Sequence, residues 1–153
     1  MHTFSERPTA AARISLFADD VVSPLPVLVL GATLAMAIAI VHLEDQGGLL
    51  GNVTPAWMKY GYYLVETTSA IAAALLIRGK VLGWALGMAS SIGPMTGYLM
   101  SRTVGVPGDP GDIGHWGYML GTVSLLVEGS FIVLAVVSLR RIARHARLRH
   151  AGG

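Results

Sequence analysis

Two glutamates lie near the middle of apolar stretches of this sequence, each long enough to form a helix that crosses a membrane. Glu66 follows Trp57 by nine residues and Glu128 follows Trp116 by twelve. At ~1.5 Å per helical residue, these spacings place the carboxyl groups roughly 13 and 18 Å below the tryptophans. A carboxyl group at bilayer depth is expensive and usually has a partner or a task. The pair therefore predicts a site for a proton, a metal cation or a small polar ligand.

Helical spacing gathers further residues with these glutamates. Side chains three or four residues apart share one face of a helix, and four such stripes occur: Lys59, Tyr62, Glu66 and Ser69; Gly117, Gly121, Ser124 and Glu128; Ser91, Pro94, Tyr98 and Arg102; and Gly31, Ala35, Ala39 and His42. We expect each stripe to face the interior of a helix bundle. The predicted ligand- or ion-binding residues are Glu66, Glu128, Arg102, His42, Tyr98 and Tyr62.

These side chains have distinct expected roles. The two glutamates would approach each other across the bundle and carry the proton or cation. Arg102 is their expected counter-charge, because its long side chain reaches down from the end of its helix. His42 is a ligand or a proton relay at the mouth of the site. One negative charge is then left over, which a proton, a bound cation or a positive group of a partner subunit must balance.

Other interpretations of the same residues remain open. The glutamates would also serve as protonated acids that only hydrogen-bond between helices. His42, Glu66 and Glu128 are candidate ligands of a divalent metal, and His42 with His115 would suit a haem. The sequence has no cysteine, which excludes thiolate sites and cysteine nucleophiles. No serine or threonine lies in a nucleophile motif, so no catalytic residue is assigned and the sequence favours a non-enzymatic protein.

The elements that position these residues follow from composition. The chain has 153 residues, of which 53% are hydrophobic and only 13% charged, whereas about 25% are charged in a typical soluble domain. Its apolar stretches have the length that a helix needs to cross a bilayer. We therefore expect an all-α, integral membrane four-helix bundle. Its spans are about 24–42, 57–77, 81–101 and 116–139, within a domain of residues 22–140 that is flanked by segments 1–21 and 141–153.

The distribution of basic residues predicts the orientation of this bundle. Residues expected at one end include Arg7, Arg13, Arg78, Lys80 and five arginines between 140 and 149. The positive-inside rule then places both termini in the cytoplasm. A set of aromatic residues would form a belt at the outer interface: Trp57, Tyr60, Trp116 and Tyr118. Nine arginines against two lysines, with abundant Ala, Gly and Val, are typical of a bacterium with a GC-rich genome.

Small residues and the outer loop complete the pattern. Pairs of small residues four positions apart allow helices in a bilayer to approach closely, and they occur as Gly31 with Ala35, Gly83 with Gly87, Gly93 with Gly97, and Gly117 with Gly121. Pro94 is expected to interrupt the hydrogen bonding of the third helix. The Gly- and Pro-rich segment 102–117 is long for a loop in such a bundle and is expected to cover a site. Within it, Asp109 and Asp112 are expected to be solvated turn residues.

Two segments of the chain resemble known proteins. The sequences Ser101–Gly108 and Ser124–Gly129, together with Val41-His42-Leu43, are similar to a pattern in small multi-span membrane proteins of actinobacteria and related high-GC bacteria. The resemblance covers about the last third of the chain and one tripeptide. It implies a fold and a location in the bacterial cytoplasmic membrane, and it implies no reaction. It includes His42, Arg102 and Glu128 but not Glu66.

The sequence thus predicts a small multi-pass protein that binds or translocates a proton, a metal cation or a small polar ligand at an intramembrane polar site. A second hypothesis is a non-catalytic accessory subunit of a larger membrane complex. A third is a redox protein that holds haem or a quinone. The expected partners are the lipid bilayer, a small polar ligand or cation, and a membrane protein or a second copy of the chain; no nucleic acid is expected.

Overall fold

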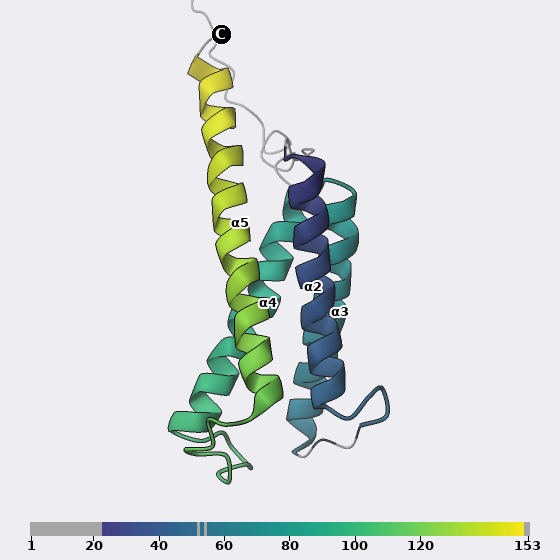
Figure 1. The fold of residues 1–153 in the computed structure, drawn as a ribbon, viewed down its shortest axis with the longest axis vertical. Helices are drawn as coiled ribbons and strands as arrows, with labels where there is room; N and C mark the ends of the chain where they lie inside the picture. The colour runs from purple at the N-terminus through teal and green to yellow at the C-terminus, as the bar shows by residue number, and fades with distance from the viewer. Residues whose placement is uncertain (1–22, 52, 54, 152–153) are drawn as a thin grey trace, which may run out of the picture.

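Four helices make up nearly all of the chain that the structure describes. The computed structural model describes residues 23–51, 53 and 55–151. The helices are α2 (Leu25–Asp45), α3 (Ala56–Ile77), α4 (Val81–Thr103) and α5 (Met119–Ala151) (Figure 1). The expected all-α class is therefore confirmed. The predicted segment 1–21 lies outside the described residues.

The helices form a bundle in which each one packs against its neighbours in the chain, and α5 closes the ring against α2. Within the described residues, the backbones of α3 and α5 do not approach each other closely. They therefore occupy opposite corners of the bundle. One end carries the tight turn between α3 and α4 and the start of α2, and the other end carries the two longer loops (Figure 1).

Three of these helices, α2, α3 and residues Met119–Leu148 of α5, are long and apolar enough to cross a membrane. The helix α4 is of similar length, with 23 residues, but is not among them. Its sequence explains the difference, because four glycines, three serines, Pro94 and Arg102 dilute its apolar residues. Several of its polar residues are buried inside the bundle, including Ser90, Ser91 and Arg102.

The fourth helix differs most from its prediction. It was expected from about Trp116 to Leu139, but it begins at Met119 and ends at Ala151. The start is later because residues before it form turns, with the amide of Trp116 bonded to the carbonyl of Gly114. The end is later because Arg, Ala and Leu, which dominate the basic segment, are good helix formers. The C-terminal part of α5 therefore extends past the rest of the bundle (Figure 1).

Aromatic rings pack closely on glycines at the end of the bundle away from the long loops. Trp84 and Phe131 are fully buried, and their ring centroids lie 5.8 Å apart. Both rings press on glycines of neighbouring helices. A Cβ atom added at Gly31 would lie 2.6 Å from the Trp84 ring, and one added at Gly87 would lie 2.1 Å from the Phe131 ring. The structure thus confirms that Gly31 and Gly87 permit close helix approach.

We expect Gly87→Ala to be less stable than Gly97→Ala by about 1–3 kcal/mol, the usual cost of overpacking a core. The added methyl group at Gly87 displaces the Phe131 ring, whereas one at Gly97 meets nothing within 4 Å. Both variants gain the same helix propensity, so that gain cancels in the comparison. Denaturant unfolding of the two variants in detergent micelles measures the difference. Equal stabilities would show that the Gly87–Phe131 contact is absent.

Candidate functional site

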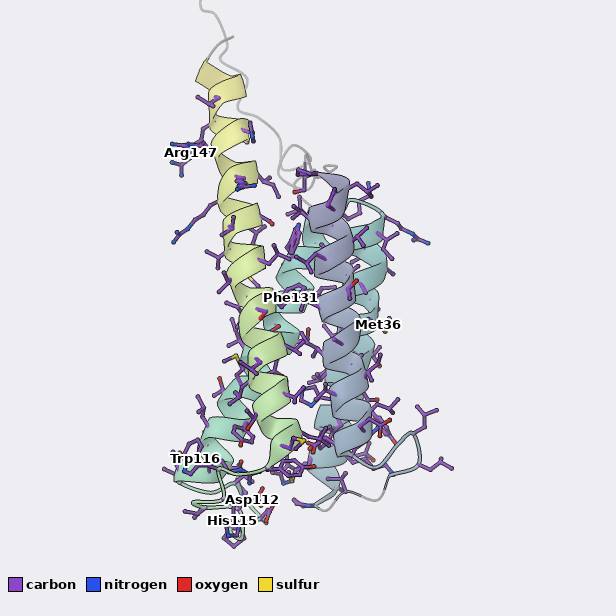
Figure 2. All side chains as sticks on the ribbon, viewed as in Figure 1. Met36, Asp112, His115, Trp116, Phe131 and Arg147 are labelled. Carbon is purple, nitrogen blue, oxygen red and sulfur yellow. The ribbon has the colours of Figure 1, made fainter. Side chains whose placement is uncertain are left out.

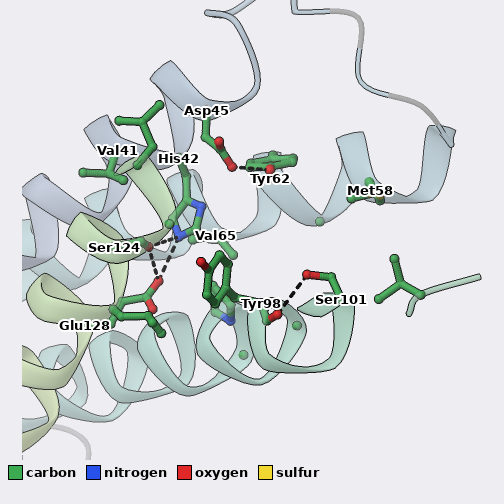
Figure 3. Close-up of a pocket in the computed structure, with 18 of the residues that line it drawn as sticks. Val41, His42, Asp45, Met58, Tyr62, Val65, Tyr98, Ser101, Ser124 and Glu128 are labelled. Carbon is green, nitrogen blue, oxygen red and sulfur yellow. Dashed lines mark hydrogen bonds and ion pairs between the residues drawn. The ribbon is translucent and has the colours of Figure 1, made fainter. Parts of the chain in front are cut away.

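A cavity of about 960 Å³ occupies the half of the bundle nearest the long loops. It lies among α3, α4 and α5, and the end of α2 and the loop between α4 and α5 complete its walls (Figure 3). Much of its surface is apolar, with Met58, Val65, Leu86, Leu120 and Leu125 among its lining residues. A volume of this size accommodates a drug-sized organic molecule.

Glycines keep this cavity open. Gly61, Gly93 and Gly97 line it, and a Cβ atom built on any of them meets nothing within 4 Å. The expected close helix packing at Gly93 and Gly97 is therefore wrong. The expectation also fails at Gly117, where an added Cβ again meets nothing within 4 Å. Pro94 lies between the two glycines of α4 and also lines the cavity.

A buried hydrogen-bonded triad forms one polar wall of the cavity. His42 Nε2 lies 2.9 Å from Glu128 Oε1, and the Ser124 hydroxyl donates to the same oxygen at 2.9 Å (Figure 3). Glu128 is only 1% exposed and His42 8%. Both of these bonds end on Oε1 of Glu128, and no bond within the described residues ends on Oε2. The second oxygen is therefore available to a molecule in the cavity.

A second polar cluster centres on Asp45, one helical turn beyond His42. The Tyr62 hydroxyl donates to one carboxylate oxygen of Asp45 at 2.5 Å, and the Tyr118 hydroxyl donates to the other at 2.6 Å. The hydrogen bond to Asp45, together with burial, raises the pKa of Tyr118 to about 12. Tyr118 thus remains a hydrogen-bond donor at neutral pH. Because Tyr118 immediately precedes α5 and Asp45 ends α2, the cluster joins these two helices at the loop end.

Arg102 has a different partner from the one expected. It forms an ion pair with Asp112 of the loop between α4 and α5, and not with either glutamate. Its guanidinium group also lies 4.8 Å from the centre of the Tyr98 ring. Asp112 lies in a turn, as expected, but the sequence did not predict its ion pair with Arg102. Arg102 and Asp112 both line the cavity, so the ion pair closes its loop end.

The two glutamates that the sequence singled out are not equivalent. Glu128 lines the cavity, whereas Glu66 is not among its lining residues. The Oε1 atom of Glu66 is buried without a hydrogen-bond partner in the described part of the chain. Although α3 and α5 occupy opposite corners of the bundle, Glu66 interacts electrostatically with His42, the residue that bonds Glu128. The counter-group of Glu128 is His42.

The structure brings most of the predicted binding residues to one cavity. His42, Tyr62, Tyr98, Arg102 and Glu128 all line it, and Glu66 does not. Sequence reasoning did not assign Asp45, Asp112 or Tyr118 to the site. The spacing of His42 and Asp45, three residues apart on one helix face, was a signal that could have identified Asp45. The contacts of Asp112 and Tyr118 depend on the path of the loop, which has no such signal.

The metal and haem hypotheses stay predictions. In residues 23–51, 53 and 55–151, no group of three or more His, Asp or Glu side chains is placed to hold a metal ion. His115 is exposed in the loop between α4 and α5 (Figure 2). His42 is buried, and its Nε2 atom is bonded to Glu128. A haem ligated by this nitrogen would require that bond to break.

Comparison with known proteins identifies no family. No protein-family model, no curated protein and no solved structure matches the chain. The functional argument therefore rests on the cavity and the residues around it.

Proposed function

We propose that this chain is a membrane protein that binds a small organic ligand inside its helix bundle, with Glu128 as the polar anchor. The cavity of about 960 Å³ is the observation that carries the proposal. A site for a proton or a bare ion needs only a few polar groups. This cavity instead has extended apolar walls, and its polar groups are concentrated in the Glu128 triad and the Asp45 cluster. That combination is the common character of small-molecule sites.

We propose further that all four helices cross the bacterial cytoplasmic membrane. Three meet the requirements of length and apolarity, and α4 packs between α3 and α5 with a comparable length. Buried polar residues of α4 are shielded from lipid by its neighbours, which permits a less apolar sequence in a spanning helix.

The charges at the two ends of the bundle support an orientation with both termini in the cytoplasm. Arg78 and Lys80 lie in the turn between α3 and α4, at the end from which α5 extends with Arg140, Arg141, Arg144 and Arg147. The opposite end carries Asp109 and Asp112 in its loop. By the positive-inside rule, the basic end is cytoplasmic. The cavity then lies in the outer half of the bilayer.

We expect Gly97→Leu to abolish ligand retention and to leave the bundle folded. The leucine side chain extends into the cavity, and its Cβ atom meets nothing within 4 Å. Gly129→Leu is the matched control, because it is equally unobstructed and does not line the cavity. Native mass spectrometry of the three proteins, released from mild detergent, measures retained small molecules directly. The wild type and Gly129→Leu are expected to retain a molecule that Gly97→Leu lacks.

Two results would count against this proposal. One is a wild-type protein that retains no molecule after gentle extraction from its own membrane. The other is a retained molecule that is equally abundant in Gly97→Leu, since that molecule would lie outside the cavity. An absorption spectrum of the same sample distinguishes a haem or quinone from a colourless ligand.

A further inference from the structure

We infer that the ligand of the cavity is a lipophilic organic cation, an inference that rests on the proposed function and specifies its ligand. Three features of the cavity point to this class: an excess of carboxylates, aromatic rings at the polar end, and apolar walls that reach the outer surface of the bundle. Each is independent of the others.

The charge of the lining residues is the first feature. Four carboxylates line the cavity, from Asp45, Asp109, Asp112 and Glu128, against the guanidinium of Arg102 and the imidazoles of His42 and His115. Asp112 already neutralises Arg102. Among the described residues, Asp45 accepts hydrogen bonds from two tyrosine hydroxyl groups, which carry no positive charge. An organic anion would therefore meet net repulsion, whereas a cation would gain a favourable charge interaction in a site of low dielectric constant.

Glu128 supplies a specific contact within this acidic lining. It is 1% exposed, and the His42 and Ser124 bonds to its carboxylate both end on Oε1. A cationic group in the cavity would make a charge-assisted hydrogen bond to Oε2 while these two bonds stay in place.

Aromatic side chains are the second feature. Trp57, Tyr62, Tyr98 and Tyr118 all line the cavity. The face of such a ring attracts organic cations, and rings grouped around a site are a common means of binding quaternary ammonium compounds. The protein already contains one such cation–π contact, in which the guanidinium group of Arg102 lies over the Tyr98 ring.

The third feature is a lateral opening toward the bilayer. Gly61 and Leu64 of α3, and Ala89, Gly93 and Gly97 of α4, line the cavity and are exposed. The cavity is open to the exterior, and we place its opening between these two helices. A ligand that dissolves in the bilayer would have direct access, which favours a lipophilic cation over a strongly hydrated one.

The test compares two probes of the same shape and opposite charge, tetraphenylphosphonium and tetraphenylborate. Each is added in radiolabelled form to the full-length protein in nanodiscs of a zwitterionic lipid, with empty nanodiscs as the background. We expect saturable binding of one tetraphenylphosphonium ion per chain and no saturable binding of tetraphenylborate. Gly97→Leu should lose this binding and Gly129→Leu should keep it. Glu128→Gln, which preserves the hydrogen-bonding shape, should weaken binding by about tenfold or more.

The outcomes separate this inference from the proposed function. If tetraphenylborate binds as tightly as tetraphenylphosphonium, or if Glu128→Gln binds the cation unchanged, the cationic class is wrong. If neither probe binds while native mass spectrometry still finds a molecule lost in Gly97→Leu, the ligand belongs to another class and the proposed function stands. If the cation binds equally to Gly97→Leu, it binds outside the cavity and the inference fails.

Discussion

Replacing His42 by leucine is expected to lower the free energy of unfolding by about 3–5 kcal/mol, the usual cost of removing one partner of a buried charged pair. The substitution leaves Glu128, only 1% exposed, with the Ser124 hydroxyl as its one remaining partner among the described residues. The second substitution Glu128→Leu, added to the first, should restore most of the loss, because buried pairs replaced by apolar residues are often neutral or stabilising. Unfolding of the single and double variants in mixed micelles measures both effects.

The comparison between the single and double variants decides what the pair contributes. A double variant that is stable but retains no ligand would show that the pair serves binding rather than folding. A double variant as unstable as His42→Leu would contradict this account, since the loss would then come from the packing of the imidazole ring. The ring does pack in a tilted arrangement on Tyr62, with centroids 5.8 Å apart.

The second large effect is expected at Asp45. The substitution Asp45→Leu removes the acceptor of two hydroxyl groups, those of Tyr62 and Tyr118. Each hydrogen bond to a charged group is worth about 1.5–3 kcal/mol, and the bond of the more exposed Tyr118 is at the lower end of that range. The substitution should therefore release the residue that precedes α5, Tyr118, from the end of α2. In Asp45→Leu, hydrogen exchange of the loop between α4 and α5 should be faster than in the wild type. Exchange at Leu76 and Phe131, whose side chains are fully buried, should change much less.

The titration of Tyr118 provides a check that does not depend on unfolding. Its pKa in the folded protein is about 12, above the ordinary value of 10.0, because it donates to Asp45 and is partly buried. A raised pKa means that its contribution to stability is fully present below pH 10 and is lost as the pH rises toward 12. In Asp45→Leu, the pKa of Tyr118 should return toward the ordinary value. Ultraviolet absorbance of the tyrosinate measures this titration, and Tyr118→Phe identifies which signal belongs to Tyr118. A wild-type Tyr118 that titrates at the ordinary value would show that the bond to Asp45 is absent.

Much of this fold was predictable because helices within an apolar sequence follow from local information. The first three helices begin and end within a few residues of their predicted positions. Helical spacing also placed His42, Tyr98, Arg102 and Glu128 on inward faces, and all four line the cavity. These predictions needed only the periodicity of the α-helix.

The order of helices around the bundle was not predictable in the same way. Spacing shows which face of α3 carries Glu66 and which face of α5 carries Glu128, but not that these helices stand at opposite corners. The partner of Arg102 depends likewise on the path of a long loop. The glycines of α4 illustrate the same limit, since Gly87 packs against Phe131 while Gly93 and Gly97 face a cavity. Identical residue types have opposite roles, and only the positions of neighbouring helices distinguish them.

The most direct test of this account compares two glutamates of the same chain by native mass spectrometry. Glu128→Gln removes a carboxylate that lines the cavity, and Glu66→Gln removes one that does not. We predict that the retained molecule is lost from Glu128→Gln and kept by Glu66→Gln, with both proteins folded. If Glu66→Gln loses the molecule and Glu128→Gln keeps it, the cavity between α3, α4 and α5 is not the binding site.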